Sequence, residues 1–143
     1  WMMEHAHQLS KDPYFSLQQR LNIDEYKIKF IPQATFLKAG RLNIMHGHQL
    51  SGKFGVGAAP ARAVFAKAKK SVIIGHVHVA DNYTDNNLDR EVSTCWTTGC
   101  LCTLTPDYNP IGGKACHGFA HAIIEDNGDF KVDNIRIHKG IIL

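Results

Sequence analysis

The sequence lacks a long hydrophobic run. No segment approaches the roughly 20 apolar residues of a membrane-spanning helix. No basic segment followed by an apolar one marks a signal peptide near the N-terminus. We therefore expect a cytoplasmic protein that does not bind a membrane. The 143 residues are 44% hydrophobic and 20% charged. These values are typical of a globular protein, and we expect a single domain over residues 1–143.

The chain also has little excess charge. Its net charge is +3 at pH 7. Lys67, Lys69 and Lys70 form its clearest basic cluster, but they fall at the expected end of a helix, where cations complement the helix dipole. Charge alone therefore does not indicate a nucleic-acid-binding protein.

Cysteines are few, at positions 95, 100, 102 and 116. Without a secretion signal we expect free thiols in place of a disulfide framework. Cys100-Leu101-Cys102 does not have the spacing of the usual zinc knuckle, so zinc on these cysteines is the lesser alternative. No serine nucleophile elbow and no clear Cys/His pair is present, which argues against covalent nucleophilic catalysis.

The middle of the chain has the pattern of a strand, a loop, a helix and a second strand. Residues 42–45 and 71–75 are short apolar runs, and residues 58–70 have apolar side chains at helical spacing. A glycine-rich loop covers residues 46–57. Since a helix connects them, the two strands should be parallel. Their carboxyl ends would then meet at one sheet edge, where open α/β sheets bind ligands.

Further elements are expected on both sides of this βαβ unit. Asp12 and Pro13 would start a helix over about residues 13–22, followed by short strands over 26–31 and 34–38. After the unit we expect a polar loop at 81–87 and strands at about 91–96, 99–104, 117–125 and 129–138. Asn127-Gly128 predicts a hairpin turn between the last two. The predicted fold class is α/β, a βαβ unit with an antiparallel β region packed beside it.

A glycine-framed histidine motif follows each of the two parallel strands. These motifs are His46-Gly47-His48 and Gly75-His76-Val77-His78. Neutral imidazole is a common metal ligand. His76 and His78 would point the same way if the strand continued, and each could serve one ion of a pair about 3.5–4 Å apart. Both glycines permit tight turns. We therefore take His46, His76 and His78 as candidate metal ligands.

The loop before the helix imitates a nucleotide-binding motif. Residues 47–53 nearly match a P-loop, but Phe54 stands where Ser or Thr would bind Mg²⁺. Residues 55–60 begin like a dinucleotide fingerprint, but Pro60 replaces its final glycine. Nucleotide binding through the Gly47–Lys53 loop is kept as an alternative function. The helix N-terminus could also help to hold a phosphate.

Two other histidine pairs are weaker candidates. On a helix His5 and His7 would diverge by about 200°, so they do not make a ligand pair. His117 and His121 would share one face of a strand, and they are candidate pocket residues.

Together these motifs resemble the calcineurin-like metallophosphoesterases. Residues 44–48 and 73–78 resemble the family's fourth and fifth conserved blocks. Residues 99–102, 106–109 and 117–119 look like its phage-type branch. The family's earlier blocks, which carry aspartates and an asparagine, are not found, and the chain opens at Trp1. The chain therefore resembles the C-terminal portion of such an enzyme.

The resemblance implies part of a two-sheet α/β sandwich and hydrolysis of a phosphoester substrate, which could be DNA or RNA. By motif, His46 and His76 would bind the second metal, His78 the first, and His48 would lie near the phosphate as a catalytic residue. The complete enzyme would hold two divalent ions such as Mn, Zn, Fe or Ni.

We expect the chain alone to be inactive. Three imidazoles leave two dications uncompensated, so at most one ion should bind, and weakly. Turnover would need the missing N-terminal half, supplied in cis or in trans. The alternative from another class is a non-catalytic metal-binding or assembly module that needs a partner chain.

Overall fold

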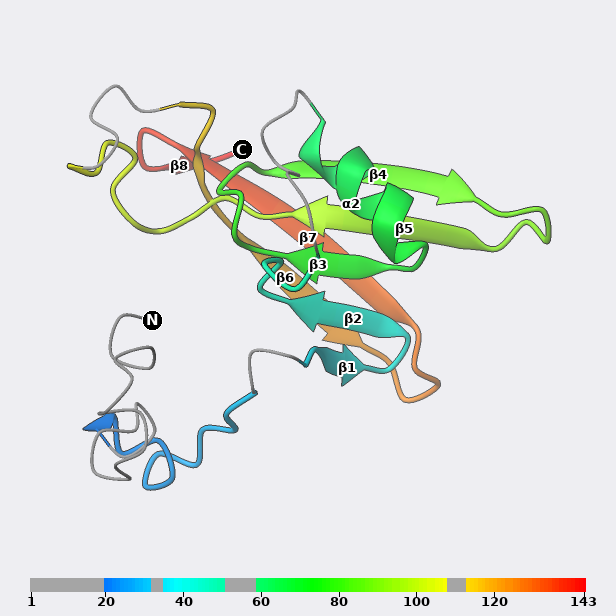
Figure 1. Ribbon diagram of the computed structural model, residues 1–143, viewed down its shortest axis with the longest axis horizontal. Helices are drawn as coiled ribbons and strands as arrows, with labels where there is room; N and C mark the ends of the chain where they lie inside the picture. The colour runs from blue at the N-terminus through cyan, green and yellow to red at the C-terminus, as the bar shows by residue number, and fades with distance from the viewer. Residues whose placement is uncertain (1–19, 32–34, 51–58, 108–112) are drawn as a thin grey trace. The chain divides into compact units, whose positions relative to one another are not determined.

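The computed structural model describes residues 20–31, 35–50, 59–107 and 113–143 (Figure 1). The chain divides into two compact units, Trp1–Pro32 and Gln33–Leu143. None of the helices in the described ranges is long and apolar enough to cross a membrane.

In the first unit, residues 21–27 form turns and residues 28–31 have no regular structure, where a strand was expected over 26–31. The amide of Ile28 donates to the carbonyl of Ile23 at 2.8 Å, and Lys27 has a positive φ of 54°. Tyr26 and Ile28 stay exposed. The strand prediction is wrong because alternating apolar residues need a partner strand, and residues 20–31 pair with none. The helix expected over 13–22 lies outside the described residues except for its last positions.

A five-stranded mixed sheet forms the centre of the second unit (Figure 1). Its order is β1 (Leu37–Ala39), β2 (Leu42–Met45), β3 (Val72–Ile74), β5 (Val92–Thr97) and β4 (Asp81–Asn86). β2, β3 and β5 run parallel, whereas β1 and β4 pair antiparallel at the two edges. Helix α2 (Pro60–Ala68) connects β2 to β3. The predicted βαβ unit is therefore confirmed.

Helix α2 lies against β4 and β5 (Figure 1). It begins at Pro60. Proline has no amide hydrogen, but at the start of a helix this costs no hydrogen bond because the first helical amides have no partner within the helix. The carboxylate of Asp81 accepts a hydrogen bond from the Ala61 amide at 3.1 Å. Lys69 ends the helix in the left-handed conformation. The core cluster between the helix and the sheet consists of Val64 of α2 with Val72, Ile74 and Cys95 of the strands.

The segment expected to be a polar loop, residues 81–87, is instead mainly strand β4. It pairs with β5 from Asp81 opposite Thr97 to Asn86 opposite Val92. The hydroxyls of Thr84 and Thr94 lie 2.9 Å apart across this pair. The loop prediction is wrong because an edge strand needs only a partner, and its outward side chains can be polar. Strand β5 thus pairs parallel to β3. The sequence pattern instead predicted this strand as part of the antiparallel region.

A separate three-stranded antiparallel sheet ends the chain. It contains β6 (His117–Ile124), β7 (Phe130–His138) and the short β8 (Ile141–Ile142). The predicted hairpin turn is confirmed, with Gly128 at φ 84° and the Glu125 amide bonded to the Asp129 carbonyl at 2.8 Å. The strand expected at 99–104 is wrong. Only Cys100 forms a bridge there, to His117, because this segment is otherwise bent.

Candidate metal site

The register of two parallel strands places the histidine motifs side by side. Met45 lies opposite Ile74, so His46 and Gly75 leave the sheet at the same edge. The ring centroids of His46 and His76 are 4.8 Å apart. The ring of His48 lies 5.1 Å from that of His46. The structure therefore brings His46, His48 and His76 together at the carboxyl ends of β2 and β3.

His46 and His48 lie close enough to act as a pair. Their Nδ1 atoms are 3.0 Å apart, so one ring donates to the other when no metal is present. Two imidazole nitrogens on one ion, each about 2.0–2.1 Å from it, are separated by about 3 Å. This spacing therefore fits either a hydrogen bond that orients both rings or chelation of a single ion.

The charge state of His46 also suits metal binding. Partial desolvation lowers its pKa, and the neighbouring imidazoles of His76, His48 and His78 lower it further. The uncharged form of His46, which is the form that ligates a metal, is therefore favoured.

The backbone after β3 departs from the expected extended course. The Val77 amide donates to the Gly75 carbonyl at 2.6 Å, and His76 and His78 have positive φ values of 55° and 56°. His76 and His78 were expected to point the same way only if the strand continued through them. The strand ends at Ile74, so this condition is not met. Left-handed conformations are uncommon outside glycine and asparagine, and they cluster at functional sites.

Only one of the two motif glycines is required by the geometry. Gly47 has φ 117°, and a Cβ there would lie 3.2 Å from the Cβ of His76 and from Ile74 Cδ1. Gly75 has no positive φ, and the nearest atom to its added Cβ would be the His46 carbonyl oxygen at 3.8 Å. Gly47 therefore lets the two motifs approach, whereas Gly75 has room for a side chain.

His78 lies with two cysteines that sequence reasoning did not join to it. The ligand atoms of His78, Cys100 and Cys102 all lie within 4.8 Å of one another. Across the described ranges this is the only set of three His, Cys, Asp or Glu residues that meets this distance. The Cys-Leu-Cys spacing was the available signal, but no sequence pattern showed that the bend after β3 would carry His78 toward it.

The environment of Cys100 favours the neutral thiol. Its side chain is buried, and all four cysteines are free. Burial raises the pKa of Cys100, and the neighbouring Cys102 and Cys116 add to this effect. Cys102, in contrast, is exposed.

The remaining candidate histidines take separate positions. His117 Nε2 lies 3.0 Å from the carbonyl oxygen of Cys102. His121 lies 3.9 Å from Asp133 on the exposed face of the hairpin. His5, His7 and the second half of the P-loop-like segment, Lys53 and Phe54 included, lie outside the described residues.

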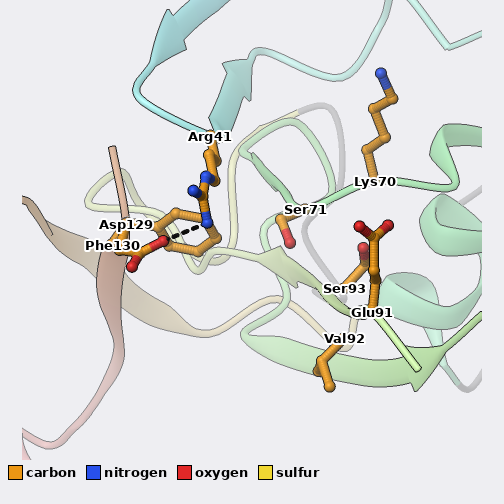
Figure 2. A pocket seen from close by; sticks show the side chains of 8 residues that line it. All are labelled: Arg41, Lys70, Ser71, Glu91, Val92, Ser93, Asp129 and Phe130. Carbon is orange, nitrogen blue, oxygen red and sulfur yellow. Dashed lines mark hydrogen bonds and ion pairs between the residues drawn. The ribbon is translucent and has the colours of Figure 1, made fainter. Parts of the chain in front are cut away.

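A polar cavity of about 640 Å³ lies at the other edge of the sheet, near the amino ends of β2, β3 and β5 (Figure 2). Arg41 pairs there with Asp129 at 2.7 Å. Figure 2 shows Lys70 and Glu91 away from this pair, on the far side of Ser71. Because ligands of parallel sheets bind at the carboxyl ends, this cavity is not the candidate site.

No family model, curated protein or solved structure matches this chain.

Proposed function

We propose that this chain supplies the histidine ligands for the metal centre of a metal-dependent phosphoester hydrolase. The observation that carries the proposal is the 4.8 Å approach of the His46 and His76 rings at neighbouring parallel strand ends. Motif resemblance supplies the reaction class, a calcineurin-like phosphoesterase, and the two sheets would form part of its sandwich. The substrate would be a phosphomonoester, a phosphodiester or a nucleic acid.

In this proposal each histidine has a distinct task. His46 and His76 hold a divalent ion, and the lowered pKa of His46 favours the neutral imidazole that ligates a metal. His48, with its Nδ1 atom 3.0 Å from that of His46, orients the phosphate or the His46 ring. Bound divalent ions supply Lewis-acid activation of the phosphoryl group. The ring of His78 is left out of this centre because its ligand atom lies with the two thiols.

The proposed centre needs carboxylates that the described residues do not bring to it. No Asp or Glu in those ranges forms a three-membered ligand group with His46 or His76. Imidazoles do not neutralise two dications, whereas carboxylates do. We propose that an additional segment, in cis or on another chain, contributes these acids, and that the 143 residues alone do not turn over substrate.

An activity assay with complementation tests the proposal. The purified chain is assayed with Mn²⁺ and an aryl phosphodiester, alone and together with a polypeptide that carries the aspartate and asparagine blocks of a calcineurin-like phosphoesterase. We expect hydrolysis only when both are present. His46→Ala and His76→Ala should each lower the rate of the complemented enzyme by at least about 100-fold, because each removes a metal ligand.

His121→Ala is the matched control, since His121 is exposed and lies 3.9 Å from Asp133 on the β6–β7 hairpin. It should leave the rate unchanged. Equal activity of the His46→Ala and wild-type enzymes would refute the assignment of the centre. Hydrolysis by the chain alone would refute the need for outside carboxylates.

A further inference from the structure

We propose that His78, Cys100 and Cys102 form a separate metal site for one thiophilic divalent ion of the zinc class. The site lies beside the His46 and His76 pair but uses none of its residues. The proposal does not depend on the hydrolase activity, and it replaces the role that family resemblance gives to His78.

The distances suit a tetrahedral ion after a small adjustment. With zinc–sulfur bonds of about 2.3 Å, two thiolates on one ion lie about 3.8 Å apart, and a thiolate and an imidazole about 3.5 Å apart. The three ligand atoms here are already within 4.8 Å of one another. Cys102 is exposed, so its side chain is free to rotate toward an ion. Three protein ligands leave a fourth position open.

The nature of the ligands selects the ion. Thiolate and imidazole favour zinc and similar metals, whereas Mg²⁺, Ca²⁺ and Mn²⁺ prefer oxygen ligands. The sulfurs of Cys100 and Cys102 lie within 4.8 Å of each other, and two thiolates this close would repel one another without an ion between them. A bound dication would remove that repulsion and hold the coordinating thiols deprotonated.

Three chain segments are joined by backbone hydrogen bonds to form the scaffold of the site. The Cys116 amide donates to the His78 carbonyl at 2.8 Å, and the Cys100 amide donates to the Cys116 carbonyl at 2.9 Å. The Gly118 amide then donates to the Cys100 carbonyl at 3.1 Å. These bonds fix the positions of two of the ligands before any ion binds, which is what a metal site requires.

Neighbouring polar groups support the ligands without joining them. His117 Nε2 lies 3.0 Å from the Cys102 carbonyl oxygen and so restrains the exposed end of the Cys-Leu-Cys segment. The Ala80 amide donates to the Cys116 sulfur at 3.2 Å. The Cys116 sulfur does not belong to the group of ligand atoms within 4.8 Å of one another, so we do not count it among the ligands.

Cobalt substitution tests the site directly. One equivalent of Co²⁺ added to the fully reduced chain should produce thiolate-to-cobalt charge-transfer absorption, and Zn²⁺ should abolish it by displacement. Cys102→Ser and His78→Ala should each weaken Co²⁺ binding by at least about 100-fold. Cys102 is exposed, so its replacement should not unfold the protein.

Two variants serve as controls. Cys95→Ala removes a buried thiol outside the site, and His46→Ala removes a ligand of the neighbouring centre; both should keep the absorption band. A reduced wild-type chain that gives no band with Co²⁺, or a band that persists at full strength in Cys102→Ser, would overturn the proposal. If the wild-type chain gives the Co²⁺ band but His46→Ala does not lower the rate of the complemented enzyme, this site is upheld and the proposed function is refuted.

Discussion

The side-chain amide of Asn134 donates a hydrogen bond to the backbone carbonyl of Thr97 at 3.0 Å. The same nitrogen lies 3.1 Å from the Asp81 carbonyl. Thr97 and Asp81 are partners at one end of the β4–β5 pair, and Asn134 lies in β7. One side chain therefore connects the antiparallel sheet to the mixed sheet, just before the segment that carries Cys100 and Cys102.

Replacement of this residue by Asn134→Ala should destabilise the protein by about 1–3 kcal/mol, because two carbonyl groups lose their shared donor. The shift is measured as the change in urea midpoint at constant slope. Lys131→Ala, also on β7, removes only an exposed ion pair with Asp133 and should change stability by less than about 0.5 kcal/mol. Equal midpoints for the two variants would show that the connection contributes nothing.

The sequence was most informative where local pattern and topology agree. The apolar runs at 42–45 and 71–75, with an amphipathic helix between them, were sufficient to predict parallel strands. Parallel pairing then placed His46 and His76 at the same edge. That inference needed only the rule that a helical crossover joins parallel neighbours.

Prediction failed where structure depends on distant partners. Strand β4 is polar and could not be recognised without β5 beside it. His78 was expected to point the same way as His76 if the strand continued, but the strand ends at Ile74 and the turn at Gly75–Val77 follows it. The approach of Cys100 to His78 depends on hydrogen bonds to Cys116, far along the chain. No local signal encodes such a contact.

The two motif glycines should respond differently to alanine. Gly47→Ala forces a Cβ into a positive-φ conformation and against the His76 side chain, so we expect a loss of about 1–2 kcal/mol. Gly75→Ala meets no atom closer than 3.8 Å and should stay within about 0.5 kcal/mol of the wild type. Urea unfolding gives both values. A larger loss for Gly75→Ala than for Gly47→Ala would contradict the geometry of the histidine motifs.

Stability at alkaline pH should depend on Cys95. Burial raises the pKa of this thiol from an ordinary 9.0 to about 11. The unfolded chain therefore loses the proton first, so the stabilisation is complete below pH 9 and falls as the pH rises to 11. At about 1.4 kcal/mol per pKa unit the loss is about 2–3 kcal/mol.

Urea midpoints measured at pH 8, 9, 10 and 11 for the wild type and for Cys95→Ala test this dependence. The variant should lose less stability across the range than the wild type does, even though its cavity makes it less stable at pH 8. Parallel curves for the wild type and Cys95→Ala would refute the assignment.

Gly99 should control the proposed thiol site without being part of it. A Cβ at this position would lie 2.6 Å from both the Cys116 carbonyl oxygen and the Gly118 amide nitrogen. Both atoms are backbone, so the segment that carries Cys100 must move away from its hydrogen-bonding partners. Gly99→Ala should therefore weaken Co²⁺ binding by at least about tenfold and destabilise the fold by about 1–3 kcal/mol.

Gly113→Ala is the matched control, because a Cβ there meets nothing within 4 Å. It should bind Co²⁺ as the wild type does and unfold at the same urea concentration. Circular dichroism confirms that each variant is folded at the concentration used for the titration. The added Cβ must push the backbone at Gly99 away from the backbone at Cys116 and Gly118. If folded Gly99→Ala nevertheless binds Co²⁺ as tightly as Gly113→Ala, the close approach of these two segments does not position the metal ligands.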